Sequence, residues 1–334
     1  MEDTYGGRYC KASGTYSTGA ITLTVTGAGA SSAYIFTPGD IVRNARTGEN
    51  MLVATVASVT TITIATGGRG FGTTAEVAIA DGDGLFIIGN VNEEGGVARQ
   101  VNQTRSTPQT NYCQIFRTTI SLTDSEKNSD VYGPKDLVYQ RAKLGTQHCL
   151  DIEKAFWFGE KKYDTSGTQG HPRRATGGIL EFINSGNSYI QSQDGMLTRP
   201  DFNVFLREAF TYGNTTKVLF AGGVVIQAIN EFAAGQLQTQ PLISTYGVQV
   251  SKYVTSFGII NIVHNPLFVE DYAGYAFLLD MECFRYRYLN NRDTHLKMNI
   301  QQNDLDGQAD EYLTECGLER RQASRHALLK GVEG

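Results

Sequence analysis

Histidine and carboxylate side chains on one predicted helix are the first place to look for chemistry. His148 and Asp151 lie three residues apart, and Glu153 follows two residues later. A histidine beside carboxylates can ligate a metal ion or act as a general base. No second histidine lies one helical turn away. The favoured interpretation is therefore a surface or interface pair formed by His148 and Asp151.

The sequence contains no recognisable motif for catalysis or for cofactor binding. It has no H-E-x-x-H, G-x-S-x-G or Walker pattern. Residues 68–72 are glycine-rich but lack the G-x-G-x-x-G spacing and precede a β-like stretch. Residues 81–84 and 304–307 pair two aspartates without the glutamate that completes a calcium loop. We interpret all three segments as turns and predict no catalytic residue, no metal site and no cofactor.

Basic residues gather in two compact clusters. Arginine pairs stand at 173–174 and 320–321. Such clusters bind nucleic-acid phosphates or pair with carboxylates, and we favour ion pairing across an interface between subunits. The predicted inter-subunit contact residues are Arg173, Arg174, Arg320, Arg321, His148 and Asp151.

Residues 285–288 alternate arginine and tyrosine, as a protein that binds single-stranded nucleic acid can. In a β-strand, however, successive side chains point to opposite faces. A structural strand with one buried face and one exposed face is the preferred interpretation.

Composition narrows the classes of protein that are compatible with this chain. The 334 residues are 40% hydrophobic and 19% charged, with 37 glycines and 7 prolines. The net charge of −5 argues against a protein held on nucleic acid by its overall field. The five cysteines are scattered and lack C-x-x-C spacing, which indicates reduced thiols. No stretch approaches a membrane span, so we expect a soluble protein without membrane contact.

The elements that must position these residues begin with a small all-β module. Residues 21–90 alternate apolar and polar side chains and are punctuated by glycine turns, a pattern typical of a barrel or of two packed sheets. A polar linker and a strand at 113–122 follow. Residues 134–162 then predict a long helix, with a stripe formed by Val138, Ala142, Gly145, Cys149, Ile152 and Phe156.

The rest of the chain mixes helices and strands. Helices are predicted at 200–212 and 222–234, and strands at 248–254, 259–264 and 275–289. The tail at 311–331 predicts a hairpin or one long strand. The fold class is therefore α+β.

Several segments from residue 113 onward resemble the major capsid proteins of tailed bacteriophages with the Hong Kong 97-type fold. The segments are 116–120, 132–134 leading into 140–159, 174–179, 196–198 and 313–319. They are similar to the subgroup in which a β-module enlarges the extended loop. The resemblance covers most of the chain.

The resemblance implies a division of the chain into five parts. Residues 1–16 would be the remnant of an N-terminal arm, and 17–112 an extended loop carrying an inserted β-barrel-like module at about 21–90. Residues 113–215 would form the peripheral domain with a spine helix at 134–162. The axial domain would span 216–298, and 299–334 would return to the peripheral domain.

The resemblance also implies a function without catalysis. Many copies would assemble into hexamers and pentamers of an icosahedral shell around double-stranded DNA, with weak non-specific contact to that DNA. Decoration, portal and scaffolding proteins would be partners, and the shell would assemble in the host bacterial cytoplasm to become part of the virion. The alternatives are a tail-tube or decoration protein, or a hydrolase with a β accessory domain.

Overall fold

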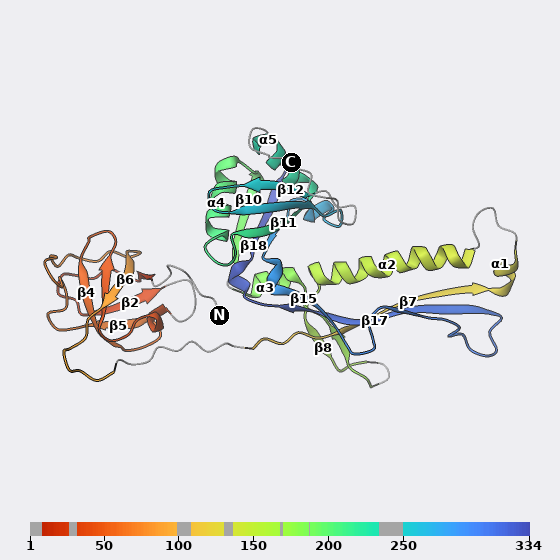
Figure 1. Cartoon of the computed structure of the whole chain (residues 1–334), viewed down its shortest axis with the longest axis horizontal. Coiled ribbons are helices and arrows are strands. Elements are labelled where there is room, and N and C mark those ends of the chain that lie inside the picture. Colours follow the sequence, from red (N-terminus) through yellow and green to blue (C-terminus); the bar gives the residue numbers. More distant parts are fainter. Residues whose placement is uncertain are drawn as a thin grey trace. The chain divides into compact units, whose positions relative to one another are not determined.

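The computed structural model describes residues 9–26, 32–98, 108–129, 136–167, 170–186, 188–233 and 250–334. The chain divides into two compact units, Met1–Thr107 and Pro108–Gly334 (Figure 1). Each unit has its own hydrophobic core. The predicted start of the long helix at Pro134 lies outside the described residues.

The first unit is a closed six-stranded β-barrel with strand order β1-β2-β5-β4-β3-β6. The strands are β1 (Tyr9–Ala12), β2 (Thr22–Thr26), β3 (Asp40–Asn44), β4 (Asn50–Val56), β5 (Thr61–Ile64) and β6 (Gly84–Asn90). Alternation builds the core, because Leu23 and Val25 of β2 point inward while the threonines between and beside them do not. The predicted start of the module near residue 21 is too late, since β1 closes the barrel between β2 and β6.

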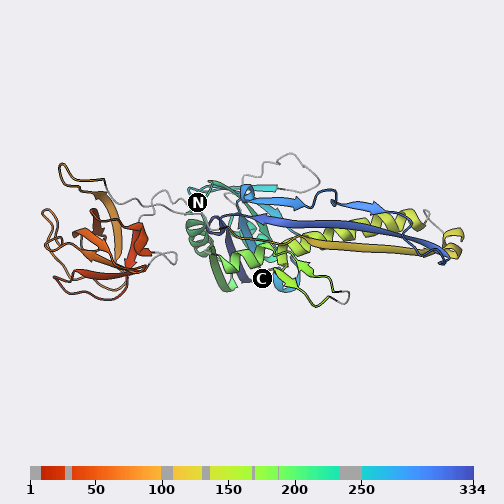
Figure 2. The same cartoon turned by 90° about the horizontal axis from the view of Figure 1, so that it is seen from below.

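A long antiparallel sheet forms one half of the second unit. Its strands are β7 (Gln114–Thr123), β15 (Phe284–Tyr288), β16 (His295–Lys297) and β17 (Gly307–Arg320). Strand β17 pairs with β7 along one edge and with β15 and β16 along the other. The short helix α1 (Asp124–Asn128) follows β7, and α2 (Asp136–Phe158) then runs back along the sheet (Figure 2).

Helix α2 packs on the sheet through a narrower stripe than the sequence predicts. Gly145 lies against Tyr312, and His148 and Ile152 are buried. Val138 is 61% exposed, and Ala142 and Cys149 are exposed as well, so these three members of the predicted stripe are wrong. The stripe that contacts the sheet runs through Gly145, His148 and Ile152.

The far end of α2 also differs from the prediction. The helix ends at Phe158, whereas the predicted end at residue 162 lies in strand β8 (Lys162–Asp164), which pairs with β9 (Arg173–Ala175). Gly159 follows the helix where there is no room for a side chain. An added Cβ would lie 2.4 Å from the carbonyl oxygen of Ala155. The lysines therefore belong to a hairpin and not to the last helical turn.

A six-stranded mixed sheet forms the other half of the second unit. Its order is β10-β18-β14-β11-β13-β12. The strands are β10 (Tyr189–Met196), β11 (Thr216–Ala221), β12 (Val250–Val254), β13 (Ile259–His264), β14 (Ala276–Leu279) and β18 (Ala327–Glu333). The remaining helices are α3 (Ile179–Ser185), α4 (Arg199–Ala209) and α5 (Gly223–Ala233), with 3-10 turns at Ser32–Ile35, Glu270–Tyr272, Met281–Cys283 and Ala323–Arg325.

Both faces of this sheet are covered. Leu219 packs with α4 and α5 on one face, whereas the neighbouring Phe220 packs with α3 and the end of α2 on the other. Trp157 of α2 makes edge contacts with Phe220 and Phe268, with ring centroids 5.1 and 5.0 Å apart. The C-terminal end of α2 is thus anchored in the core of the six-stranded sheet.

The α+β class is confirmed, but the sheets divide the chain differently from the predicted boundaries. Strands β10 and β18 fall outside 216–298 yet belong to the six-stranded sheet, and β15 and β16 fall inside it yet belong to the long sheet. The tail is neither a hairpin nor one strand, because β17 and β18 lie in different sheets. The same holds for 275–289, which splits into β14 and β15.

Candidate interaction surface

His148 is enclosed between α2 and the long sheet. Its Nδ1 lies 2.9 Å from the Thr118 hydroxyl oxygen and its Nε2 lies 2.8 Å from that of Thr314. Burial lowers the pKa of His148, so the neutral imidazole is favoured. The residue therefore cannot form the predicted inter-subunit contact. Asp151, its predicted partner, is exposed.

The two arginines of the predicted cluster, Arg320 and Arg321, have different surroundings. The Arg320 side chain is buried, donates to the carbonyl oxygen of Gly178 at 2.7 Å, and pairs with Glu181. Arg321 directly follows β17, is exposed and pairs with Glu319 of that strand. The Arg320 charge is used inside the chain, and its contact with another subunit stays a prediction.

Arg173 and Arg174 lie on the exposed β8–β9 hairpin. Arg174 stands opposite Tyr163 in the register, and its guanidinium lies 5.7 Å from the centre of that ring. The Tyr163 ring also lies 5.7 Å from the ring of Tyr112, and the Lys161 ammonium lies 5.4 Å from Tyr112. We call these four residues, Lys161, Tyr112, Tyr163 and Arg174, the cation–aromatic ladder. A contact of this kind is stabilised by the ring quadrupole and leaves part of each charge open to a partner.

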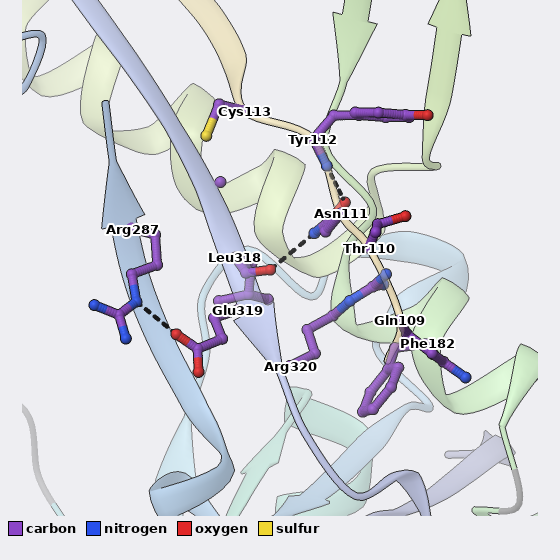
Figure 3. Close-up of a pocket in the computed structure, with 11 residues that line it drawn as sticks. Gln109, Thr110, Asn111, Tyr112, Cys113, Phe182, Arg287, Leu318, Glu319 and Arg320 are labelled. Carbon is purple, nitrogen blue, oxygen red and sulfur yellow. Dashed lines mark hydrogen bonds and ion pairs between the residues drawn. The ribbon is translucent and has the colours of Figure 1, made fainter. Parts of the chain in front are cut away.

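Next to the ladder is a cavity of about 230 Å³ (Figure 3). It opens beside the segment that precedes β7, where β17 continues past the first residue of that strand. The residues that line it are Gln109, Thr110, Asn111, Tyr112, Cys113, Phe182, Arg287, Gly317, Leu318, Glu319 and Arg320. Glu319 accepts a hydrogen bond from Arg287 there, so the carboxylate is held by a cation of the same chain. The lining offers backbone and amide groups together with the Cys113 thiol, whose pKa is raised by burial.

Asn111 fixes the chain at the rim of this cavity. Its Nδ2 donates to the carbonyl oxygens of Leu318 at 2.8 Å and Gly177 at 3.0 Å, and its Oδ1 accepts from the Gly177 N–H at 2.8 Å. The Asn111 side-chain amide thus hydrogen-bonds to the main chain of β17 at a point that β7 does not reach. Sequence analysis missed this residue, because a lone asparagine in a polar stretch carries no pattern.

Sequence analysis also missed the carboxylates of β17. Asp310 and Glu311 are buried, and Glu315 is nearly so. Their partners are Arg141 of α2, Arg117 of β7 and Arg292. Each pair joins β17 to a different segment, so these ion pairs hold the long sheet and its helix together. The signal was a run of acidic residues inside a strand that is otherwise apolar.

The glycine-rich turns are structural, as predicted. Arg69 of the segment 68–72 is buried and forms two hydrogen bonds with Glu49, at 2.6 and 2.9 Å. Hydrogen bonds from Arg46 lower the pKa of Asp83 in the segment 81–84 to about 2. Arg69 and Asp83 are therefore engaged inside the barrel, whereas Asp81 is exposed.

Two further observations concern the ranges that the structure describes. Within them, no three His, Cys, Asp or Glu side chains gather closely enough to hold a metal ion. None of the helices described is long and apolar enough to cross a bilayer.

The charged groups inside the second unit are largely used by internal ion pairs, while long faces of α2 and of the hairpin stay exposed. These features define a structural subunit built around extended surfaces. Comparison with known families is more specific. The chain belongs to the SU10 major capsid protein family, whose model matches residues 16–333. This match confirms the resemblance to phage major capsid proteins.

Individual relatives are distant. The chain is 24% identical over 274 residues to the major capsid protein of Pseudomonas phage PaMx41, covering 78% of this chain and 64% of that protein, slightly less than two thirds of its length. Among solved structures, the cyanophage A-1(L) capsid asymmetric unit is 12% identical with a TM-score of 0.46, covering 74% of this chain and 85% of that one. Mycobacterium phage Patience is 14% identical with a TM-score of 0.45, covering 73% and 78%.

Proposed function

We propose that this chain is the repeating subunit of an icosahedral phage head. Copies form hexamers and pentamers through head-to-tail contacts, and these close into a shell around double-stranded DNA. The observation that carries the proposal is the family match over residues 16–333. The subunit acts through shape and contact surfaces and not through a reaction.

The exposed face of α2 supports association. Val138 and Tyr139 are 61% and 52% exposed, and Leu150 is exposed further along the helix. An amphipathic helix normally turns its apolar residues away from water, so these exposed side chains are available to a partner. A neighbouring subunit would cover this face in the shell.

The sheets suggest how the predicted domains map onto the structure. In our proposal, the long sheet with α2 forms the peripheral domain, with α2 as the spine helix. The six-stranded sheet with α4 and α5 forms the axial domain at the centre of each capsomer. The β-barrel belongs to the extended loop, which reaches a neighbouring subunit.

The proposal extends to partners and to location. Decoration, portal and scaffolding proteins are the expected partners, and the shell assembles in the host bacterial cytoplasm. The net charge of −5 limits adhesion to the packaged DNA, so contact with the genome is weak and local. Proteomics of purified virions would test the location, because a major capsid protein is expected to dominate the head fraction.

Negative-stain electron microscopy of the purified protein, paired with light scattering, tests the proposal. Capsomer rings, tubes or closed shells of megadalton mass are the expected result. A stable monomer or dimer across protein concentration and salt would contradict it. The hydrolase alternative would then be tested at the cavity beside Asn111.

A further inference from the structure

The β8–β9 hairpin is strongly basic. Residues 161–175 contain two lysines and two arginines against one carboxylate, Asp164. Tyr163 stands between these cations on the cation–aromatic ladder and is 48% exposed. The hairpin thus offers an aromatic surface surrounded by positive charge.

A complementary surface lies where β7 and β17 meet at their far ends, with Thr123 paired to Gly307. Asp124 and Glu126 follow β7 in α1, and Asp304 and Asp306 precede β17. One lysine, Lys127, stands among these four carboxylates. We call this surface the acidic tip.

The acidic tip also has an apolar centre. Leu305 stands between Asp304 and Asp306 and is 52% exposed. Its main-chain N–H donates to the carbonyl oxygen of Gln302 at 3.1 Å, which fixes the turn. An apolar centre with a charged rim is the usual form of a specific protein interface. Leu305 with its two aspartates therefore matches Tyr163 with its surrounding cations in both charge and polarity.

The two surfaces of one copy do not meet. The ten residues of β7 separate them, which corresponds to about 33 Å at the rise of a β-strand. Both views show α1 at the end of the long sheet that lies away from the β8–β9 hairpin (Figures 1 and 2). A contact between them must join two molecules.

We propose that the turn at Asp304, Leu305 and Asp306 of one copy docks on the β8–β9 hairpin of a second copy. The aspartates pair with Lys161 and Arg174, which share the ladder with Tyr163, and Leu305 packs on Tyr163. This is a heterologous contact, in which different surfaces of identical chains meet, and repetition of it generates rings or larger assemblies. The inference rests on the proposed assembly function and names one of its contacts.

Two charge-reversed variants test the contact. The hairpin variant carries Lys161→Glu with Arg174→Glu, and the tip variant carries Asp304→Lys with Asp306→Lys. All four side chains are exposed or at the surface, so folding should be retained, and circular dichroism with thermal unfolding would check this. Each variant alone should assemble at a protein concentration about tenfold higher, because like charges then oppose each other at the contact. The matched control is Arg199→Glu, exposed at the start of α4 and outside both surfaces, which should assemble as the unmodified chain does.

The decisive step mixes the two variants. In the mixture, the acidic tip of the hairpin variant can bind the basic hairpin of the tip variant, and the reversed tip can bind the reversed hairpin. The mixture should therefore assemble, as should a chain carrying all four substitutions. Failure of both to recover would overturn the proposal. Sedimentation velocity measures the recovery of oligomers independently of shell closure. A chain that forms charge-dependent oligomers but no shells would therefore contradict the proposed function and still support this contact.

Two other outcomes would also overturn the inference. If both single variants form normal shells, the contact does not contribute and the proposed function stands without it. If the hairpin variant assembles normally but binds double-stranded DNA more weakly in a gel-shift assay, the hairpin contacts nucleic acid instead of a second copy.

Discussion

At the scale of single residues, burial holds His326 in its neutral form. Its Nδ1 accepts a hydrogen bond from the Asp280 N–H, and its Nε2–H donates to the carbonyl oxygen of Arg321, each at 3.2 Å. Burial lowers the pKa of His326 to about 4, and the nearby Lys217 and Arg325 also disfavour a second positive charge. The protonated imidazole would lose a hydrogen-bond acceptor as well as its hydration.

This environment predicts how stability depends on pH. An unfolded histidine binds its proton near pH 6.5, whereas the folded one does so near pH 4. Stability from His326 is therefore complete above pH 6.5, falls by about 3 kcal/mol as the pH drops to 4, and levels off below that. Urea unfolding of unassembled chain across this window should show a smaller loss in His326→Gln than in the parent. The exposed His264→Gln serves as control, and equal slopes in all three proteins would contradict the assignment.

The barrel contains a buried ion pair with a predictable cost of disruption. Glu49 accepts from Arg69 and from the main-chain N–H groups of Gly70 and Val77. Although burial opposes ionisation of Glu49, these hydrogen bonds lower its pKa. Glu49→Gln would leave the Arg69 charge buried without its partner.

We expect Glu49→Gln to destabilise the barrel by about 3 kcal/mol or more, because one charge of a buried pair is left unpaired. Replacing both partners, as in Glu49→Leu with Arg69→Met, should restore much of that loss. Thermal unfolding of the three proteins would measure this coupling. A single substitution costing less than about 1 kcal/mol would show that the pair behaves like an exposed one.

At the scale of elements, Gly145 sets how closely α2 approaches the long sheet. A Cβ at this position would lie 3.1 Å from the hydroxyl oxygen of Tyr312. That hydroxyl donates to the carbonyl oxygen of Arg141 at 3.1 Å, so the tyrosine ring is tied to the helix and cannot easily move away.

Gly145→Leu should therefore destabilise the second unit by about 2 kcal/mol, as overpacking of a close contact does. The matched control is Gln147→Leu, because Gln147 is exposed on the same helix. Chemical denaturation would compare the two. Equal stabilities would mean that α2 can move off the sheet without cost.

Local patterns predicted many of the elements but not their partners. Alternation identified the barrel strands, and helical spacing identified α4, because both signals depend on neighbouring residues. The stripe on α2 was misplaced because a polar residue, His148, occupies its centre and small residues occupy the exposed side. The two hydroxyl partners of His148 come from β7 and β17, and the sequence alone does not show that these strands lie together.

The candidate contact residues show the same limit. Arg320 and Arg321 are adjacent in sequence, yet Arg320 ends β17 and packs against Glu181, whereas Arg321 follows the strand and is exposed. Arg173, Arg174, Arg320, Arg321 and Asp151 remain predicted contacts. Lys217 was overlooked for a related reason: its ammonium donates to the carbonyl oxygens of Ala209, Tyr212 and Arg325, and main-chain acceptors leave no trace in a sequence.

At the scale of the whole molecule, the central claim is that this one chain builds the shell. The family match supports the claim, and the exposed faces of α2 and of the hairpin supply surfaces for it. In contacts of this kind, a patch on one copy meets a different patch on an identical copy. Repetition of such contacts builds rings that close where the rotation between copies permits.

Cryo-electron microscopy of particles assembled from the purified chain tests this claim most directly. We expect an icosahedral reconstruction whose hexamers and pentamers both consist of this chain, with the second unit visible in every position. A protein that stays monomeric or dimeric under all assembly conditions, or particles in which this chain occupies only decorating positions, would contradict it.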